Sequence, residues 1–306
     1  MLARVGVALA GLLVGLLAVE LGLRGAVGLG WPERLADPGA YSDPLCHDSY
    51  WTMALGAGRL REHSVHERDE RLGWVPDRRS LAPIGAWGTP KHPVGDERPV
   101  LALFGDSFVF GTVEPRLPDA LQELVPDRRV LNFGVAGYGL DQIVLRLEER
   151  AAALRGAEVW IGVLTSDLDR TVLRHRSGPK PVWTGVGFEQ LEPRGLPSYL
   201  GGWLRMHGPW RDLDCARDEK LAKAEQLFER AAGACGEHEL DCRVLLFQSR
   251  GEVQGWRHEA IVGGAGVVGG LLDSRPVLED RHYGEDRHPS AEGNLALALW
   301  LAEEAR

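Results

Sequence analysis

Short apolar runs alternate with helix-like stretches from residue 99 to the end of the chain. The runs that have the length of buried strands are 100–104, 130–133, 159–164 and 244–247, with a fifth candidate at 266–272. The stretches with helical character are 118–124, 141–153, 216–234 and 291–305, and Ser290 stands where the last of them needs its N-cap. Such alternation is typical of a parallel sheet covered by helices. The pattern therefore predicts an α/β fold.

The segments outside this alternation have no sustained period. Residues 31–98 are rich in Pro, Gly, His and Trp and predict an irregular lead-in, with short strands around 71–75. Residues 174–207 predict an insertion or lid. The glycine-rich stretch 263–270 lacks the spacing of a phosphate loop and predicts a flexible connection. We expect three parts along the chain, at 1–30, 31–98 and 99–306.

The N-terminal part, 1–30, is a hydrophobic segment. It is uncharged from Val5 to Val19, is interrupted by Glu20 and Arg24, and continues with apolar residues. As one helix it can span a bilayer, whereas its uninterrupted part is shorter than the roughly 20 residues that a spanning helix needs. We expect a retained signal anchor with the rest of the chain outside the cytoplasm, in the periplasm or at the cell surface. A cleaved signal peptide and a buried helix of a soluble protein are the alternatives.

The composition is that of an ordinary globular protein. The chain has 306 residues, of which 44% are hydrophobic and 26% charged, and its formal net charge is -9 at pH 7. It has no dense run of Lys or Arg and no aromatic motif of the RNA-binding kind. These features argue against nucleic acid as its main partner.

The cysteines permit two disulfides in an exported protein. Cys235 and Cys242 are the best candidates for a local bridge, because the loop between them would join a helix end to a strand start. Four unpaired buried thiols are the alternative. A metal site is not expected, since no Cys-x-x-Cys pair exists and His63 and His66 lack a third well-spaced ligand. The full set of cysteines is Cys46, Cys215, Cys235 and Cys242.

A serine stands directly after the first apolar run of the α/β region. The run 100–104 leads into Gly105-Asp106-Ser107. In open α/β sheets ligands bind at the carboxyl ends of the strands, and a serine at the following helix start has backbone N–H groups beside it that can stabilise an oxyanion. Ser107 is therefore a candidate nucleophile. The alternative is a helix N-cap without chemistry.

A histidine near the C-terminus supplies the base that a nucleophilic serine needs. His288 precedes the last predicted helix, with Asp286 two residues and Glu285 three residues ahead of it. An acid beside the histidine sets its tautomer and stabilises the imidazolium. This motif is weak on its own, because most histidines are structural or exposed.

Together these blocks resemble the SGNH hydrolases, also called the GDSL esterase and lipase family. The family's first block is a strand followed by Gly-Asp-Ser, its second has Asn and, five residues on, Gly, as in Asn132 and Gly137, and its last has an acid, His and usually Pro. The resemblance covers about 99–306, which it implies is the catalytic domain. It also implies Ser107 as nucleophile, His288 as base, and Gly137 as an oxyanion-hole donor together with the Ser107 N–H.

Two departures from the family pattern concern the site. The third block usually reads Gly-x-Asn-Asp, with the Asn side chain donating to the oxyanion, whereas Ser166 takes the place of that Asn here. A hydroxyl donates one hydrogen bond but is shorter than the amide. The family commonly places its acid three residues before His, where this chain has Glu285. Some extracytoplasmic members that act on polysaccharides have Asp-x-His, so we expect Asp286 to be the acid, with Glu285 as the alternative.

The motif Gly-x-Ser-x-Gly is absent, which argues against the other large α/β hydrolase fold. With Ser107 early in the domain and His288 at its end, a flavodoxin-like, three-layer arrangement is favoured.

Asp167 and Arg170 follow the third strand and are expected to hold their loop in place by a salt bridge. Three tryptophans of the insertion could stack on sugars or simply pack in a lid or core: Trp183, Trp203 and Trp210.

The resemblance implies a serine esterase that forms an acyl-serine on Ser107 and uses no metal or organic cofactor. The expected substrate is a small acyl ester or an acylated glycan, with an O-acetyl group on an extracytoplasmic glycan favoured by family and location. One alternative is an O-acetyltransferase that passes the acyl group to a cell-surface polysaccharide. Another is a non-catalytic protein on the same fold, for which Ser166 is the only sequence hint.

Overall fold

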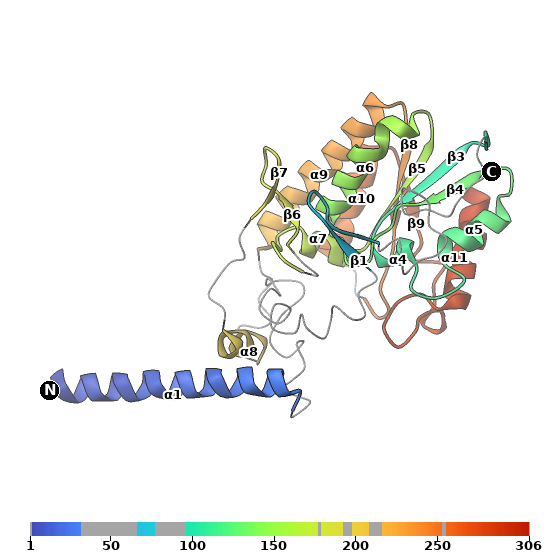
Figure 1. The fold of residues 1–306 in the computed structure, drawn as a ribbon. Coiled ribbons are helices and arrows are strands. Elements are labelled where there is room, and N and C mark those ends of the chain that lie inside the picture. The colour runs from blue at the N-terminus through green and yellow to red at the C-terminus, as the bar shows by residue number, and fades with distance from the viewer. Residues whose placement is uncertain are drawn as a thin grey trace. The chain divides into compact units, whose positions relative to one another are not determined.

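The computed structural model describes residues 2–31, 66–76, 96–176, 179–191, 198–207, 216–252 and 255–305. The chain divides into two compact units (Figure 1). Unit 1 comprises Met1–Ser64, Leu173–Pro179 and Leu191–Cys215, and unit 2 comprises Val65–Val172, Lys180–Gln190 and Ala216–Arg306. The predictions for four residues lie outside the described residues: Cys46, His63, Trp210 and Cys215.

Unit 2 is built on a parallel five-stranded sheet. Its order is β4-β3-β5-β8-β9, and each neighbouring pair is parallel. Numbered along the chain, this is the 2-1-3-4-5 order of flavodoxin-like folds. The predicted α/β fold class is confirmed. The strands are β3 (Val100–Phe104), β4 (Arg129–Asn132), β5 (Glu158–Val163), β8 (Asp241–Leu246) and β9 (Leu271–Asp273).

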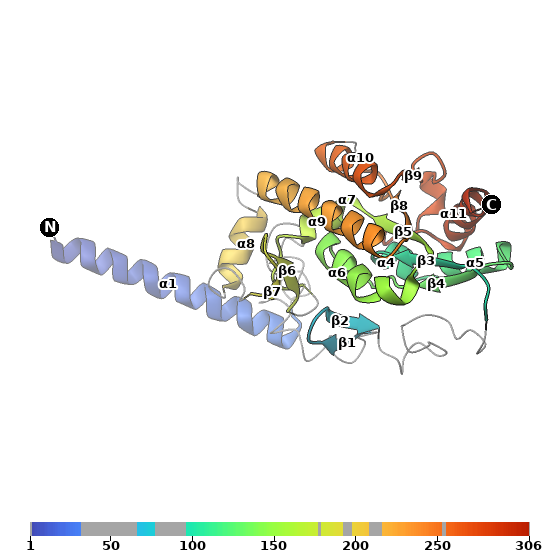
Figure 2. The ribbon, with the colours of Figure 1, turned by 90° about the horizontal axis from the view of Figure 1, so that it is seen from above.

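Helices cover both faces of the sheet, which gives the three predicted layers (Figure 2). One face packs against α6 (Leu140–Ala151), α9 (Arg217–Glu237) and α10 (Trp256–Val268). The other face packs against α5 (Leu117–Leu124) and α11 (Ala291–Glu304). Shorter helical turns complete the unit: α4 (Ser107–Phe110), α7 (Thr165–Arg170), Ala152–Leu154 and Asp280–His282.

The central strands are buried on both sides. In β5, Val159 and Ile161 enter the cluster under α6 and α9, while Trp160 enters the cluster under α5 and α11. A strand with two buried faces has no polar side, so it appears in the sequence as a continuous apolar run. This explains why four of the strands were located within a few residues of their bounds.

The predictions for the glycine-rich stretch are wrong. Residues 263–268 belong to α10, and β9 begins only at Leu271, so neither a strand from 266 nor a flexible connection exists there. The helix packs closely on α9: a Cβ on Gly264 would lie 2.1 Å from Cδ2 of Phe228. Gly269 and Gly270, with φ of 149° and 154°, end the helix in a conformation that L side chains rarely adopt.

A hairpin of β1 (His66–Asp69) and β2 (Gly73–Pro76) precedes the sheet, which agrees with the short strands predicted around 71–75. Leu72 and Trp74 are buried in the same cluster as α6. Trp74 Nε1 donates to the carbonyl of Ala136 over 3.1 Å, and the hydroxyl of Tyr138 donates to the carbonyl of Trp74 over 2.6 Å. The hairpin therefore braces the loop that carries Gly137.

The insertion 174–207 contributes to both units. Its hairpin, β6 (Pro181–Trp183) and β7 (Phe188–Gln190), belongs to unit 2. Trp183 is buried there and its Nε1 donates to Gln226 Oε1 over 2.6 Å, so core packing is the correct interpretation for this tryptophan. Trp203 lies on α8 (Tyr199–His207) in unit 1 and is 38% exposed.

Unit 1 contains α1 (Leu2–Leu29), whose part Val5–Leu29 is long and apolar enough to cross a membrane. Glu20 on this helix accepts hydrogen bonds at the start of α8, from the hydroxyl of Ser198 and from the backbone N–H groups of Tyr199 and Leu200, over 2.9, 3.1 and 2.9 Å. Arg24 Nε also donates to Glu20, over 2.8 Å. By its length and composition, a single N-terminal apolar helix such as α1 fits a membrane anchor and a signal sequence equally well.

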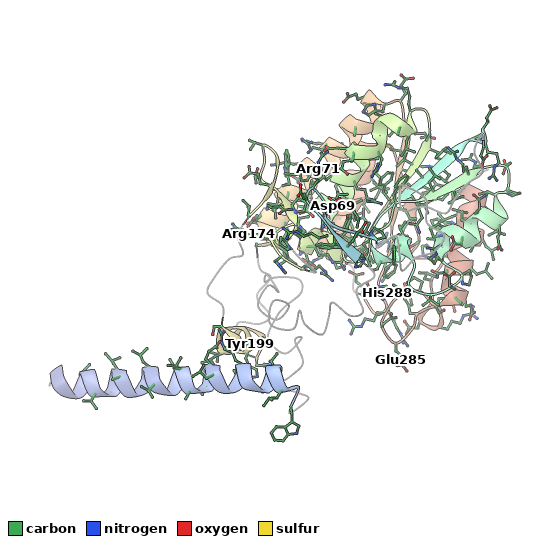
Figure 3. The ribbon with its side chains drawn as sticks, in the orientation of Figure 1. Asp69, Arg71, Arg174, Tyr199, Glu285 and His288 are labelled. Carbon is green, nitrogen blue, oxygen red and sulfur yellow. A yellow bond between two sulfur atoms is a disulfide. The ribbon has the colours of Figure 1, made fainter. Side chains whose placement is uncertain are left out.

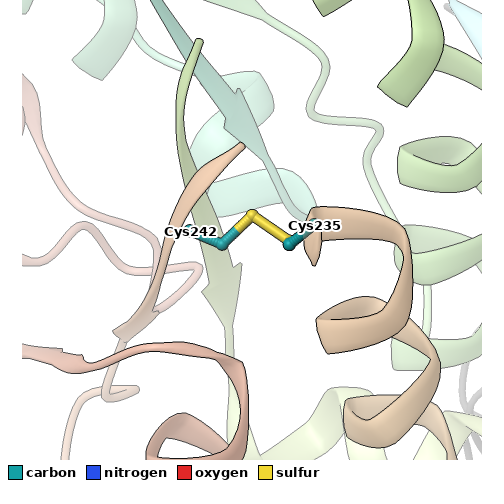
Figure 4. The surroundings of a disulfide bond; sticks show 2 residues. All are labelled: Cys235 and Cys242. Atoms are coloured by element: carbon teal, nitrogen blue, oxygen red, sulfur yellow. A yellow bond between two sulfur atoms is a disulfide. The ribbon is translucent and has the colours of Figure 1, made fainter. Parts of the chain in front are cut away.

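A disulfide joins Cys235 and Cys242, with a Cα–Cα distance of 6.2 Å (Figure 4). Cys235 lies near the end of α9 and Cys242 near the start of β8. The predicted local bridge from a helix end to a strand start is confirmed.

Candidate active site

The end of β3 positions Ser107. Gly105 follows the strand, and a Cβ there would lie 2.5 Å from Val109 Cγ2, so only glycine fits beneath the turn. Asp106 caps α4, because its Oδ1 accepts from the Phe108 N–H over 2.9 Å. Ser107 is thus the first residue of a helix at the carboxyl edge of the sheet, and it is 8% exposed.

His288 and Asp286 complete a hydrogen-bonded arrangement with Ser107. The distance from Ser107 Oγ to His288 Nε2 is 2.9 Å, and His288 Nδ1 lies 3.1 Å from Asp286 Oδ2. The His288 ring also contacts Phe108, with centroids 5.4 Å apart. Glu285 is exposed at the outer end of the loop that carries His288 (Figure 3). We call Ser107, His288 and Asp286 the candidate triad.

A tight turn accounts for the short spacing between the acid and the histidine. Gly284 N–H donates to the carbonyl of His288 over 2.8 Å, and Arg287 N–H donates to the carbonyl of Gly284 over 3.2 Å. Arg287 has a φ of 67°, in the left-handed region. The His288 N–H donates to Asp286 Oδ1 over 3.1 Å, so one carboxylate holds both backbone and ring of the histidine.

The start of α11 anchors this loop. Ser290 is the N-cap, as predicted, and its Oγ accepts from the Gly293 N–H over 3.2 Å. Asn294 Nδ2 donates to the carbonyls of Val113 and Pro115, over 3.1 and 2.9 Å. These bonds tie the His288 end of the chain to the loop that follows α4.

Gly137 lies in the loop after β4. Strand register brings this loop to the same sheet edge as Ser107, since Leu103 pairs with Asn132. Asn132 holds the loop: its Oδ1 accepts from the Gly134 N–H over 2.9 Å and its Nδ2 donates to the carbonyl of Phe110 over 3.2 Å. Gly137 is partly exposed with a φ of 82°, a conformation that favours glycine.

Ser166 lies in the first turn of α7, directly after β5. Its neighbours Thr165 and Asp167 are buried, whereas Ser166 itself is partly exposed. Its hydroxyl makes no hydrogen bond with any residue that the structure describes. Ser166 therefore lies at the sheet edge where Ser107 and Gly137 also lie.

Arg170 connects parts of the site that are distant in sequence. The predicted ion pair with Asp167 is present at 2.6 Å, and the same Nη1 lies 2.9 Å from Asp106 Oδ2. Burial on its own would lower the pKa of Arg170, but the negative charges of Asp167 and Asp106 outweigh it and raise the pKa, so the guanidinium stays charged. The role of Asp106 was missed, although its place directly before Ser107 was a usable signal.

No group of three or more His, Cys, Asp or Glu side chains that could hold a metal ion occurs in the described part of the chain. In the candidate triad the Ser107 hydroxyl lies within hydrogen-bond distance of the His288 imidazole, and the Asp286 carboxylate lies beside the other ring nitrogen. The sheet order and the candidate triad together define the class: an α/β protein with a serine-hydrolase arrangement at the carboxyl edge of its sheet.

Comparisons with known proteins gave similar structures only. No family model and no curated protein matches the chain. An acetylxylan esterase from Geobacillus stearothermophilus is 17% identical, with 70% of this chain and 96% of that chain covered and a TM-score of 0.42. A lipase/acylhydrolase from Enterococcus faecalis is 15% identical, with 67% and 94% covered and a TM-score of 0.42.

A third similar structure is a putative lipolytic protein of the G-D-S-L family from Desulfitobacterium hafniense. It is 13% identical, with 67% of this chain and 98% of that chain covered and a TM-score of 0.39. The names of the three similar structures are those of an acetylxylan esterase, a lipase/acylhydrolase and a G-D-S-L lipolytic protein.

Proposed function

We propose that the protein is a serine esterase that hydrolyses O-acyl esters through an acyl-serine intermediate. The observation that carries the proposal is the hydrogen-bonded candidate triad, with 2.9 Å from Ser107 to His288 and 3.1 Å from His288 to Asp286. Nucleophile, base and orienting acid lie in the order that nucleophilic catalysis requires.

The reaction has two steps. His288 Nε2 removes the Ser107 proton while Oγ attacks the ester carbonyl, and the imidazolium then gives that proton to the departing alcohol, which leaves the acyl group on Oγ. In the second step His288 removes a proton from water, the hydroxide attacks the acyl carbonyl, and the proton returns to Oγ as the carboxylic acid leaves. Asp286 holds the ring by its Nδ1 and stabilises the imidazolium in both steps.

Three donors serve the oxyanion in this proposal. The Ser107 N–H belongs to the first turn of α4, where the first N–H groups have no acceptor within the helix. Gly137 contributes its N–H from the loop after β4, and the Ser166 hydroxyl contributes from the first turn of α7. Donors fixed before the reaction stabilise the charge at no cost of reorganisation.

The substrate class that we propose is an O-acetyl or short acyl ester on a glycan outside the cytoplasm. Two features of the chain support this location: the apolar helix α1, which fits an anchor with the catalytic part outside, and the Cys235–Cys242 disulfide, a bond that persists in oxidising compartments. A reporter fused after Arg306 should be active only outside the inner membrane.

The test uses the purified full-length protein in detergent with acyl esters of increasing chain length and with an O-acetylated glycan. Ser107→Ala and His288→Ala should each remove activity by a factor of about 10⁴ or more while circular dichroism stays unchanged. Near-parental turnover in either variant would refute the triad assignment. Acetyl appearing on an added sugar in place of free acetate would identify an acetyltransferase, and failure to react with a serine-directed phosphonate would identify a non-catalytic protein.

A further inference from the structure

We propose that Arg170 is a positioning residue that holds the three parts of the oxyanion hole in register; the proposal rests on the proposed esterase function. Its Nη1 lies 2.9 Å from Asp106 Oδ2 and 2.7 Å from the carbonyl of Tyr138. The same nitrogen lies 2.6 Å from Asp167 Oδ1. Each acceptor is the sequence neighbour of one proposed oxyanion donor, and these donors are Ser107, Gly137 and Ser166.

The three donors come from three different loops, so nothing in the local sequence holds them together. They follow β3, β4 and β5, which end at one edge of the sheet. Arg170 bridges to Asp106 across 64 residues and to Tyr138 across 32. All three contacts converge on one buried nitrogen, Nη1, so a single charged atom can set the spacing of all three loops.

Arg170 also balances charge beside the nucleophile. Asp106 Oδ2 lies 3.2 Å from Ser107 Oγ, so it competes with His288 Nε2 for the hydroxyl proton. A second buried carboxylate, on Asp167, lies 2.6 Å from the same Nη1 of Arg170. Without the Arg170 cation, both carboxylates would repel the negative charge that develops on the oxyanion and destabilise the transition state. Burial prevents water from screening that repulsion.

The effect should fall on the transition state and not on substrate binding. Arg170→Gln should therefore lower kcat by about 10²–10³, the range for losing an oxyanion-hole donor, while KM changes little. Arg170→Lys keeps the charge but carries it on a flexible stem that does not hold the ammonium at the position of Nη1, so its kcat should lie between those of Arg170→Gln and the parent. Arg170→Gln/Asp167→Asn removes one of the two uncompensated charges and should regain part of the loss.

The matched control is Arg257→Gln. Arg257 forms an ion pair with Asp169 at 2.9 Å, so it supports the same helix α7 one residue away from Arg170. If Arg170 only stiffened α7, both variants would lose kcat alike. We expect Arg257→Gln to stay within about threefold of the parental kcat, as for a partly exposed ion pair.

The experiment measures kcat, KM and the rate of labelling by a serine-directed phosphonate for the full-length parent and each variant, with folding checked by circular dichroism. A loss of kcat and labelling rate at constant KM, confined to Arg170 variants, supports the proposal. Parental kcat in Arg170→Gln, or an equal loss in Arg257→Gln, overturns it. If Arg170→Gln does not fold, Arg170→Lys takes its place: a lower kcat and labelling rate at constant KM supports the proposal, and parental kcat overturns it. A parent that neither hydrolyses esters nor takes the label refutes the proposed function, and this inference with it.

Discussion

The acid is the most exposed member of the candidate triad. The side chain of Asp286 is 60% accessible and that of His288 is 27% accessible. We expect Asp286→Ala to lower kcat by about 10²–10⁴, because the histidine loses the group that sets its tautomer. Steady-state kinetics on an acetyl ester measures the loss. The matched control is Glu285→Ala, one residue away and exposed, which should keep parental kcat; a larger loss there would make Glu285 the acid.

Ser166 is expected to donate to the oxyanion, where the SGNH hydrolases that the sequence resembles commonly have Asn. Ser166→Ala should lower the acylation rate several-fold, up to about 10², with little change in substrate binding, because the bond matters once charge develops on the oxygen. Ser166→Asn should keep or raise the rate if the cleft has room for the amide. Pre-steady-state acylation kinetics distinguishes these cases. Unchanged rates in Ser166→Ala would mean that backbone groups or water complete the hole.

Candidate site residues could be predicted where a short local motif of the sequence marks them. Ser107 follows an apolar strand and His288 precedes a helix with an acid close by, and each of these signals fits within a few residues of sequence. The link from Arg170 to Asp106 could not be predicted, because it joins positions 64 residues apart. Only the parallel sheet brings their two loops to one edge.

At the scale of elements, the contact between α9 and α10 depends on one glycine. A Cβ on Gly264 would overlap the Phe228 ring at 2.1 Å, whereas a Cβ on Gly266 of the same helix would meet nothing within 4 Å. We expect Gly264→Ala to lower the free energy of unfolding by about 1–3 kcal/mol through overpacking. Gly266→Ala should raise it by up to about 1 kcal/mol, as for Gly to Ala in an exposed helix. Chemical denaturation measures both, and equal shifts would contradict the packing described here.

The composition of each element decided whether it could be predicted. Strands with two buried faces appear as apolar runs, so β3, β4, β5 and β8 were found. Helix α10 was missed because its buried face includes Gly264 and Ala265 while its outer face carries Val262 and Val267, so no apolar period stands out in the sequence. A helix that is rich in glycine has a composition that is also typical of loops, so composition alone could not identify it.

At the scale of the molecule, the hairpin β1–β2 shows how far unit 2 extends toward the N-terminus. Its residues Leu72 and Trp74 lie in the sheet's own core, and Gln142 Nε2 on α6 donates to the carbonyl of Leu72 over 2.7 Å. These contacts join positions up to 70 residues apart. A local pattern carries no information on such contacts, so the sequence of this segment predicts only an irregular lead-in.

The mature protein is expected to keep residues 1–29. Glu20 is the acceptor for the first N–H groups of α8, and a cleaved chain would lose this carboxylate together with α1. Losing a side-chain cap of this kind destabilises a helix by about 0.5–2 kcal/mol. Intact mass spectrometry of the protein purified from its membrane fraction gives the answer directly. A mass that lacks the N-terminal segment would contradict the retained-helix expectation.

The contact between Glu20 and α8 also concerns the order in which the protein can be made. A segment that only targets a chain to a membrane has no further role in the folded protein. In contrast, α1 supplies the Glu20 carboxylate that accepts hydrogen bonds from a segment about 180 residues later. During synthesis α1 emerges first, and until α8 is made the only one of these donors present for Glu20 is Arg24 of the same helix. Delivery and folding of unit 1 would then share one helix, and a foreign signal sequence in place of α1 would leave the Tyr199 and Leu200 N–H groups of α8 without the Glu20 acceptor.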